Sequence, residues 1–301
     1  GALQVSALTT GNISTTAADV SADTNVTNTV LDEAIASLDG ATLNVNGLNV
    51  KAQTTGNYFA LGQEAVNRIS GNTRASVENT VVTSGTGDVS VTAMDQSIIT
   101  AESADSAVDL DAEMLGLQEP SLELAAAIAK NEVTRNTEAL VSTSTISVNA
   151  GNVDVQATND ATLSATAKST SVTASDALIP TFSLTGGATI ASNVLMGGVK
   201  GAIADSTVET TTAGDLRVNA QDSSSIDALS EAGTIATGGT GSGVGASFAV
   251  NTIGWDVQNG FLDSADALLG TSAFGTESRF DVEATVVDSV VHVIGQFDAK
   301  A

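Results

Sequence analysis

Apolar and polar residues alternate along many short stretches of the chain. The stretch Val89-x-Val91-x-Ala93 places apolar side chains at every second position, which is typical of a half-buried β-strand. Similar stretches occur at residues 97–101, 145–148 and 161–165. Many short strands at a spacing of roughly 8–12 residues predict a β-sandwich, a barrel or a β-solenoid.

A first sequence pattern, Ala-x-Asn-x-(Ile/Val/Leu), recurs at a nearly constant interval. Its asparagines are Asn67, Asn131, Asn193 and Asn251, which are 64, 62 and 58 residues apart, and a weaker copy contains Asn28. Identical Asn side chains on stacked strands can form a hydrogen-bonded ladder. They can also simply occupy a bend, and the sequence leaves both interpretations open.

A second pattern, Gly-(Asp/Asn)-(Val/Leu)-x-Val-x-Ala, has the same period. Its copies begin at Gly87, Gly151 and Gly214 and end at Ala93, Ala157 and Ala220. Degenerate copies end at Ala52 and Ala284, and the chain itself opens on the pattern. Gly followed by Asp or Asn predicts a turn in front of the strand.

The fixed period favours the β-solenoid among the three all-β folds. We predict an all-β, right-handed parallel β-solenoid (β-helix), built from ~60-residue repeats of two to three coils each. The chain then forms one elongated domain with repeats at residues 1–66, 67–130, 131–192, 193–250 and 251–301. Only 3% of the residues are aromatic, so we expect a thin core of small side chains.

One segment gives conflicting predictions. Residues 120–130 are rich in Ala, Leu and Glu and start with Pro120, which favours a helix. The alignment of residues 127–131 with residues 247–251 indicates a strand instead, and we give the alignment more weight.

Charge and composition restrict the partners of the protein. The chain has 35 acidic and 10 basic residues and a net charge of −25, which disfavours binding to nucleic acid or to an anionic membrane. It contains no Cys and no run of 18 apolar residues, so we expect no disulfides and no membrane insertion.

Motifs for a cofactor or a catalytic triad are weak. Residues 239–245 have Gly at every second position but no helix start follows, so we interpret them as a strand against which another backbone packs closely. The single histidine, His292, lies at an outward strand position, which argues against a zinc site or a triad. Tyr58 and Trp255 lie in irregular stretches, where we expect them to pack under loops, with exposed contact points as the alternative.

Carboxylates are the remaining candidates for a site. Asp105, Asp109, Asp111 and Glu113 form one cluster, and Asp256, Asp263 and Asp266 form another. We interpret both as solvated surface, with weak Ca²⁺ binding as the functional alternative. Paired carboxylates could also cleave sugars, although the basic residues that such a site needs are sparse. We expect no other cofactor.

The repeats resemble those of large bacterial filamentous surface proteins, the filamentous haemagglutinin-like and fusobacterial leukotoxin-like adhesins. The resemblance lies in residues 243–253 and in the Gly-Asp-Val-x-Val-x-Ala units, and covers residues 65–284. It implies a β-solenoid, secretion to the surface of a Gram-negative bacterium, and adhesion, aggregation or biofilm formation. It brings no catalytic residues.

We therefore expect a non-catalytic structural or adhesive repeat segment, either an internal part of a longer array or a stacking subunit. The expected partners are neighbouring repeats, identical subunits placed end to end, and cell-surface or carbohydrate ligands. A calcium-loaded adhesive module and a carbohydrate-active β-helix enzyme are the alternatives.

Overall fold

The computed structural model of the chain describes residues 1–17, 25–110, 121–174, 182–237, 240–256, 276–277 and 280–301. These residues form strands and no helix. Almost all of the strands belong to three parallel sheets, A, B and C, and the short β19 (Trp255–Asp256) and β20 (Thr276–Glu277) form an antiparallel pair. The all-β class with parallel strands in stacked sheets is thereby confirmed.

The three sheets differ in strand length. Sheet A holds β1 (Leu3–Thr16), β5 (Leu48–Gly62), β8 (Val89–Asp95), β9 (Ile98–Leu110), β12 (Val153–Asn159), β13 (Thr162–Ala174), β16 (Leu216–Asp222), β17 (Ser225–Thr237) and β23 (Phe297–Lys300). Sheet B holds β2 (Asn25–Leu31), β3 (Ala34–Asp39), β6 (Glu64–Glu78), β10 (Ser121–Ser142), β14 (Phe182–Ala204), β18 (Thr240–Ile253) and β21 (Asp281–Val287). The short strands of sheet C are β4 (Thr42–Val45), β7 (Val81–Ser84), β11 (Thr145–Ala150), β15 (Thr207–Ala213) and β22 (Val290–His292).

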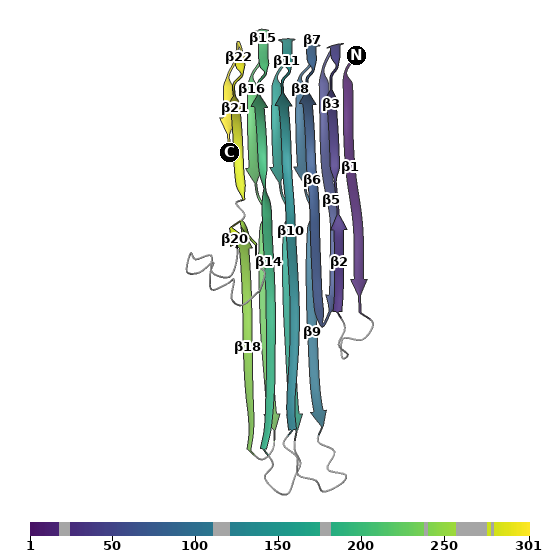
Figure 1. Cartoon of the computed structure of the whole chain (residues 1–301), viewed down its shortest axis with the longest axis vertical. Coiled ribbons are helices and arrows are strands. Elements are labelled where there is room, and N and C mark those ends of the chain that lie inside the picture. Colours follow the sequence, from purple (N-terminus) through teal and green to yellow (C-terminus); the bar gives the residue numbers. More distant parts are fainter. Residues whose placement is uncertain (18–24, 111–120, 175–181, 238–239, 257–275, 278–279) are drawn as a thin grey trace.

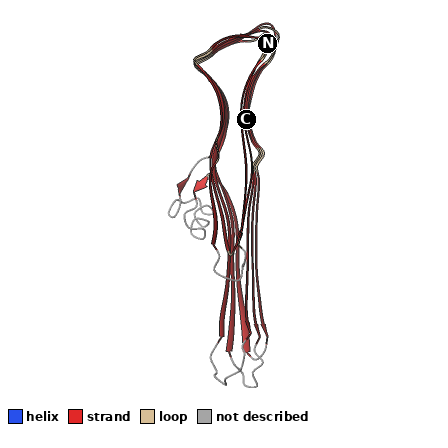
Figure 2. Cartoon of the chain, turned by 90° about the vertical axis from the view of Figure 1, so that its right-hand side faces the viewer, coloured by secondary structure: helices blue, strands red, loops and turns tan. Residues whose placement is uncertain are grey.

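The chain visits the sheets in a fixed order. It runs along a long strand of sheet B, crosses through a short strand of sheet C and returns along sheet A, as in the order β10, β11, β12, β13 and then β14. We call one such circuit a rung. Figure 1 shows the rungs lying side by side, and Figure 2 shows sheets A and B as two layers joined at one end by sheet C.

Successive rungs are in register. Ala157 lies directly beside Ala93 and Ala220 in sheet A, so residues one repeat apart are neighbours on adjacent strands. Each repeat therefore adds a single rung, and the prediction of two to three coils per repeat is wrong. The physical reason is strand length: β10 and β14 have 22 and 23 residues, and a single rung of such strands takes up the whole repeat.

The segment with conflicting predictions is a strand. From Ser121 onward, β10 pairs with β14 over its entire length, and Ala125, Ala127 and Ala129 alternate inward along it. Tertiary pairing here overrides the helix propensity of Ala, Leu and Glu. Residues 111–119 and Pro120 lie outside the described residues.

The core has a wide and a narrow part. Next to sheet C, Val, Leu and Ile side chains such as Val91, Ile146 and Ile203 fill the space between the three sheets. Further along, sheets A and B come close together (Figure 2), and the buried contact there consists almost entirely of alanines, including Ala101, Ala165 and Ala191. Small residues set this narrow gap because backbones can approach closely only where side chains are short.

The last copy of the second pattern was assigned to the wrong strand. Ala284 lies in sheet B, where it pairs with Gly201, although the pattern belongs to sheet A. The true copy begins at Gly295, whose N–H donates to Gly214 O at 3.0 Å, and continues as β23 beside β16. The error arose because any strand that faces this core shows the same alternation of apolar and polar residues.

The narrow part of the core yields a prediction. We expect Ala165→Val to lower the free energy of unfolding by roughly 1–3 kcal/mol, because the added methyl groups have no space between the sheets. The matched control is Thr166→Val on the outer face of the same strand, with an expected change of less than about 0.5 kcal/mol. Urea unfolding measures both, and equal losses would show that the gap has room to spare.

Candidate functional site

The asparagines of the first pattern form a ladder through the interior. Each side-chain N–H donates to the carbonyl oxygen of the next asparagine, over 2.8, 2.9, 2.8 and 2.9 Å from Asn28 through Asn67, Asn131 and Asn193 to Asn251. These residues lie within the strands of sheet B, in register. The structure therefore contains the ladder and not the alternative bend.

The same asparagines also connect the two sheets. The second N–H of Asn67 donates to Thr100 O in sheet A at 2.8 Å, and that of Asn131 to Ser164 O at 2.7 Å. Asn67, Asn131 and Asn193 have no exposed surface, so every one of these bonds replaces water. Each amide thus ties its rung both to the next rung and to the opposite sheet.

A second ladder, which sequence reasoning missed, lies at the corner between sheets B and C. Ser144 Oγ accepts the backbone N–H of Thr80 at 3.1 Å and donates to Ser142 O at 2.7 Å. In the same way, Ser206 Oγ accepts the N–H of Ser144, and Ser289 Oγ accepts the N–H of Ser206. Each of these hydroxyl groups also donates to the carbonyl oxygen two residues before it. The residue before each of these Ser or Thr residues is in the left-handed conformation, with a φ of 48–50°. The sequence signal for this corner is therefore the residue at that position followed by Ser or Thr, repeated once in each rung.

The second pattern forms a third ladder at the corner between sheets C and A. Asp88 Oδ1 accepts the N–H of Asn152 at 2.7 Å, Asn152 Oδ1 that of Asp215 at 3.0 Å, and Asp215 Oδ1 that of Gln296 at 2.9 Å. The predicted turn is present, and its Asp or Asn also bonds the next rung. Gly214 has a φ of 140°, and a Cβ there would overlap Gly151 O, so this stacking requires glycine.

A buried ionic cluster lies between the wide core next to sheet C and a second cluster of large apolar side chains that includes Ile69, Ile99 and Leu163. Arg135 forms ion pairs with Asp32 at 3.0 Å and with Asp95 at 3.1 Å, and the three side chains are only 2–4% exposed. Tyr58 donates its hydroxyl proton to Asp32, and its ring lies 5.7 Å from the Arg135 guanidinium carbon. Sequence reasoning missed this cluster, because its members are up to 103 residues apart.

The cluster changes the proton affinities of its members. Burial, and next the hydrogen bond to Asp32, raise the pKa of Tyr58 to about 12, while Arg135 opposes this shift. Burial lowers the pKa of Arg135, but the charges of Asp95, Tyr58 and Asp32 outweigh it and raise that pKa above its usual value. Tyr58 is fully buried within β5, so the prediction of an irregular stretch was wrong.

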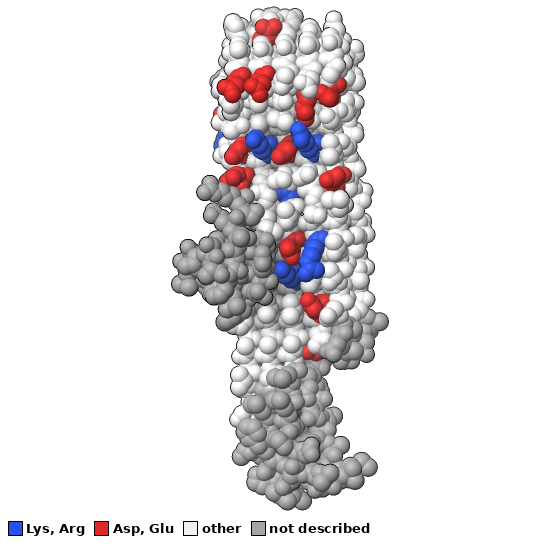
Figure 3. Space-filling model, in the orientation of Figure 1, with Lys and Arg blue, Asp and Glu red and all other residues white. Residues whose placement is uncertain are grey.

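Basic residues on the surface face carboxylates of neighbouring rungs. In sheet B, Arg74, Glu138, Lys200 and Glu283 occupy one register row and alternate in sign, with ion pairs of 3.9 Å for Arg74–Glu138 and 3.6 Å for Lys200–Glu283. Figure 3 shows this row on the face of sheet B. The few basic residues thus relieve repulsion between acidic rungs, and such exposed pairs contribute little to stability.

A shallow groove lies on the outer face of sheet A. It has a volume of about 220 Å³ and contains both charges and amides: Asp154, Gln156, Arg217, Asn219, Asp298 and Lys300. Arg217 pairs with Asp154 at 3.6 Å and with Asp215 at 2.8 Å. Burial raises the pKa of Asp154, and Arg217 opposes this effect.

Two of the weak motifs have clear positions. His292 is exposed at the end of β22, where it pairs with Glu209 of β15. Gly241, Gly243 and Gly245 lie in β18, and Gly239 lies outside the described residues. A Cβ at Gly245 would lie 3.2 Å from Ala232 O in sheet A. Both interpretations from the sequence, an outward histidine and a strand in close backbone contact, are confirmed for the described residues.

The acidic clusters fall largely outside the described residues. Asp105 accepts hydrogen bonds from Gln63 and from the N–H of Ala126. The side chains of Asp109, Asp111, Glu113, Asp256, Asp263 and Asp266 lie outside the described part of the chain. Among the residues that the structure does describe, no group of three or more His, Cys, Asp or Glu is arranged to hold a metal ion.

Comparisons with protein-family models, with curated proteins and with solved structures find no match to the chain. Membership of the adhesin family therefore stays a prediction. In the described ranges no helix is long and apolar enough to cross a membrane.

The ladder gives a prediction for its central member. Asn131→Ala removes both ladder bonds and leaves one buried N–H of Asn67 and the buried side-chain oxygen of Asn193 without their ladder partner. We therefore expect a loss of roughly 2–4 kcal/mol in the free energy of unfolding. Asn251→Ala at the exposed end is the control, with a loss below about 1 kcal/mol, since water can replace its bonds. Equal losses for the two variants in urea unfolding would contradict a larger contribution to stability from the buried asparagines than from the exposed one.

Tyr58 gives a prediction of pH dependence. It is the single tyrosine of the chain, so ultraviolet absorbance of tyrosinate reports this site alone. We expect a midpoint of about 12 in the folded protein and of about 10 in urea. Because the folded state holds this proton more tightly, its contribution to stability is complete below pH 10 and falls as the pH rises toward 12. A folded-state midpoint near 10 would contradict the buried hydrogen bond.

Proposed function

We propose that the chain is a non-catalytic structural and adhesive repeat segment of an extracellular bacterial filament or adhesin, folded as a right-handed parallel β-solenoid. The observation that carries the proposal is the unbroken, in-register asparagine ladder. Repeated rungs with identical bonds produce an extended scaffold of flat faces. Right-handedness follows from the general rule for parallel strands that are joined by a crossover.

The position of the ionic cluster supports a structural role. Arg135, Asp32 and Asp95 bring a cation and two carboxylates together, which is the composition that an acidic-sugar enzyme would need. Their side chains are nearly inaccessible to solvent, so no substrate can reach them. A buried cluster of this kind suits the fixing of a unique register between rungs.

The groove on sheet A supports an adhesive role. Gln156 of β12 and Asn219 of β16 are direct register neighbours, and Lys300 lies beside Asn219 on β23. Amide groups that project from rigid strands can donate hydrogen bonds to sugar hydroxyl groups and accept hydrogen bonds from them, and the Lys300 ammonium group can donate. We therefore propose neutral cell-surface carbohydrate as the ligand class, because the net charge of −25 repels acidic polymers.

One observation favours the carbohydrate-active enzyme as a second candidate. The same groove contains Asp154, whose pKa is raised, and Asp298, and such carboxylates could act as acid and base. Arg217 is held in two ion pairs there, which makes binding without cleavage the better-supported role. Release of reducing ends from a bound oligosaccharide would reverse this preference.

The adhesive role can be tested by display of the chain on a non-adherent bacterium. We expect attachment to immobilised neutral oligosaccharides, and a loss of attachment of at least about fivefold in the variant Gln156→Ala with Asn219→Ala, since several hydrogen bonds at ~1 kcal/mol each are removed. Thr162→Ala with Ser225→Ala, a register pair elsewhere on sheet A, should leave attachment unchanged. A folded, displayed chain that attaches no better than the empty display host would refute the adhesive role.

A further inference from the structure

A row of polar side chains crosses the outer face of sheet A and extends well beyond the groove. It consists of outward residues in a single register: Ser6, Lys51, Thr92, Gln156, Asn219 and Lys300. We call it the donor row. Its four central members lie on β5, β8, β12 and β16, and each of these strands is paired on both sides. The centre of the row is therefore part of a continuous sheet face.

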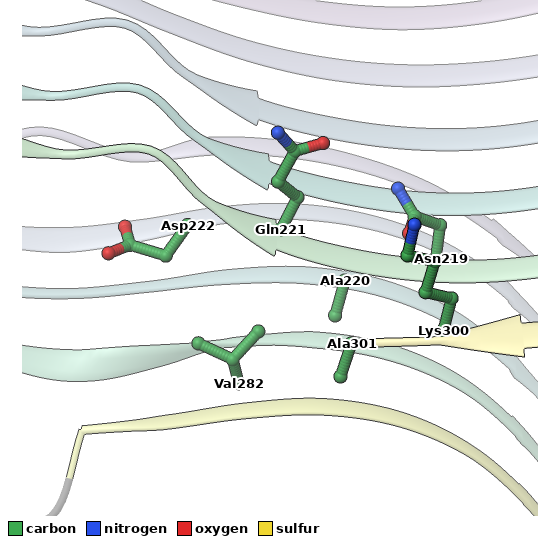
Figure 4. Close-up of a pocket in the computed structure, with 7 residues that line it drawn as sticks. All are labelled: Asn219, Ala220, Gln221, Asp222, Val282, Lys300 and Ala301. Carbon is green, nitrogen blue, oxygen red and sulfur yellow. The ribbon is translucent and has the colours of Figure 1, made fainter.

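Every member of the donor row can donate a hydrogen bond. The row contains hydroxyl, amide and ammonium groups and neither a carboxylate nor an apolar side chain. Figure 4 shows Asn219 and Lys300 side by side on one side of sheet A, while Ala220 points to the opposite side. The alternation along each strand thus brings all six donors to the same outer surface.

Lys51 has no acidic partner, although it lies inside the stack. The outward residues next to it on the neighbouring strands are all uncharged: Gln4, Ser6 and Leu8 of β1, and Ser90, Thr92 and Met94 of β8. By contrast, Lys168 and Arg217 of the same sheet form ion pairs with carboxylates of adjacent rungs. Among the described residues, none forms a hydrogen bond or an ion pair with the Lys51 ammonium group, which can therefore donate to a ligand.

The amides of the row are also available to a ligand. Asn219 makes no side-chain hydrogen bond with any other residue in the described part of the chain, and it lies directly beside Gln156. Gln156 donates a single long bond of 3.4 Å to Thr158. Two adjacent rungs thus present amides that can both donate hydrogen bonds to a ligand and accept them from it.

The spacing of the row matches a particular kind of polymer. Adjacent members are ~4.8 Å apart, and Lys51 and Asn219, which are three rungs apart, are separated by ~14 Å. An extended chain of β-1,4-linked pyranose units advances by nearly the rung spacing for each sugar. Such a chain laid across the strands would place one sugar on each rung, and flexible side chains such as Lys51 can absorb the small remaining difference.

Other linear ligands and the other direction fit the row less well. An extended peptide advances by ~3.3 Å per residue, so its groups would fall out of step with the rungs within a few residues. A sugar chain laid along a strand would meet outward side chains every ~6.6 Å, which also differs from its repeat. Nucleic acid is repelled by the net charge of −25.

We propose that sheet A binds a linear, neutral, β-1,4-linked polysaccharide whose chain crosses the strands along the donor row, with one sugar unit on each rung. The inference rests on the carbohydrate-binding role proposed above and specifies the ligand and its orientation. A single sugar held by one or two exposed hydrogen bonds binds weakly. Linked sugars bind more tightly because each further contact becomes intramolecular, so affinity should grow with ligand length.

Titration calorimetry on the intact chain tests this orientation with three sugars. Cellopentaose is an extended β-1,4-linked glucose chain, and cellobiose is its two-unit fragment. Maltopentaose has the same number of glucose units in a coiled α-1,4-linked chain, which cannot place one unit on each rung. We expect the Kd of cellopentaose to be at least about tenfold lower than that of either other sugar.

Variants at the two ends of the central part of the row test which residues the ligand reaches. Lys51→Ala and Asn219→Ala should each raise the Kd of cellopentaose at least about fivefold, since each removes hydrogen bonds to a different sugar unit. The matched control is Lys168→Ala, a lysine of the same sheet that is paired with Glu231, and it should leave the Kd within about twofold. Unchanged thermal unfolding shows that the variants are folded.

Three results would overturn the inference, and they differ in what they leave standing. Equal Kd values for cellopentaose and maltopentaose would refute the orientation across the rungs. A loss of affinity in Asn219→Ala without one in Lys51→Ala would confine binding to the groove. Both results leave the adhesive role intact. No binding of any of the three sugars would also overturn the inference, and attachment in the display experiment then shows separately whether the adhesive role fails as well.

Discussion

The structure depends on a single constraint, the register between adjacent parallel rungs. Asn131 illustrates it, since its amide bonds the asparagines of both neighbouring rungs and the backbone of the opposite sheet. A shift of one residue would turn every inward side chain outward and leave buried amides without partners. The two corner ladders enforce the same register at the two ends of sheet C. Together with the asparagine ladder, they fix the register at three positions in each rung.

Each rung is much longer than the distance that it adds to the stack. A strand such as β14 has 23 residues, so at ~3.3 Å per residue a rung is ~75 Å long, whereas each rung adds only ~4.8 Å to the stack. The chain thus builds breadth rather than length. Broad faces with rows of Thr, Asn, Gln and paired charges are the surfaces through which an adhesive role would act.

The parts of the fold that could be predicted are those with a local sequence signal. The patterns that contain Asn67 and Gly214 recur at a fixed period, and residues one period apart are neighbours on adjacent strands. The number of coils per repeat could not be predicted, because no local signal tells how far a strand runs before it turns. Arg135 and Tyr58 were missed for a related reason: their partners come from other rungs, and only the complete register brings a lone arginine between Asp32 and Asp95.

Pulsed and continuous-wave electron paramagnetic resonance on paired spin labels tests the central claim, one rung per repeat, most directly. Gln156 and Asn219 are neighbours on adjacent strands, and Thr92 lies one further rung away. We predict backbone separations of ~5 Å for labels at 156 and 219 and ~10 Å for labels at 92 and 219, with strong dipolar broadening for the first pair. Separations of ~10–15 Å for the first pair would mean two or three coils per repeat and would contradict the account.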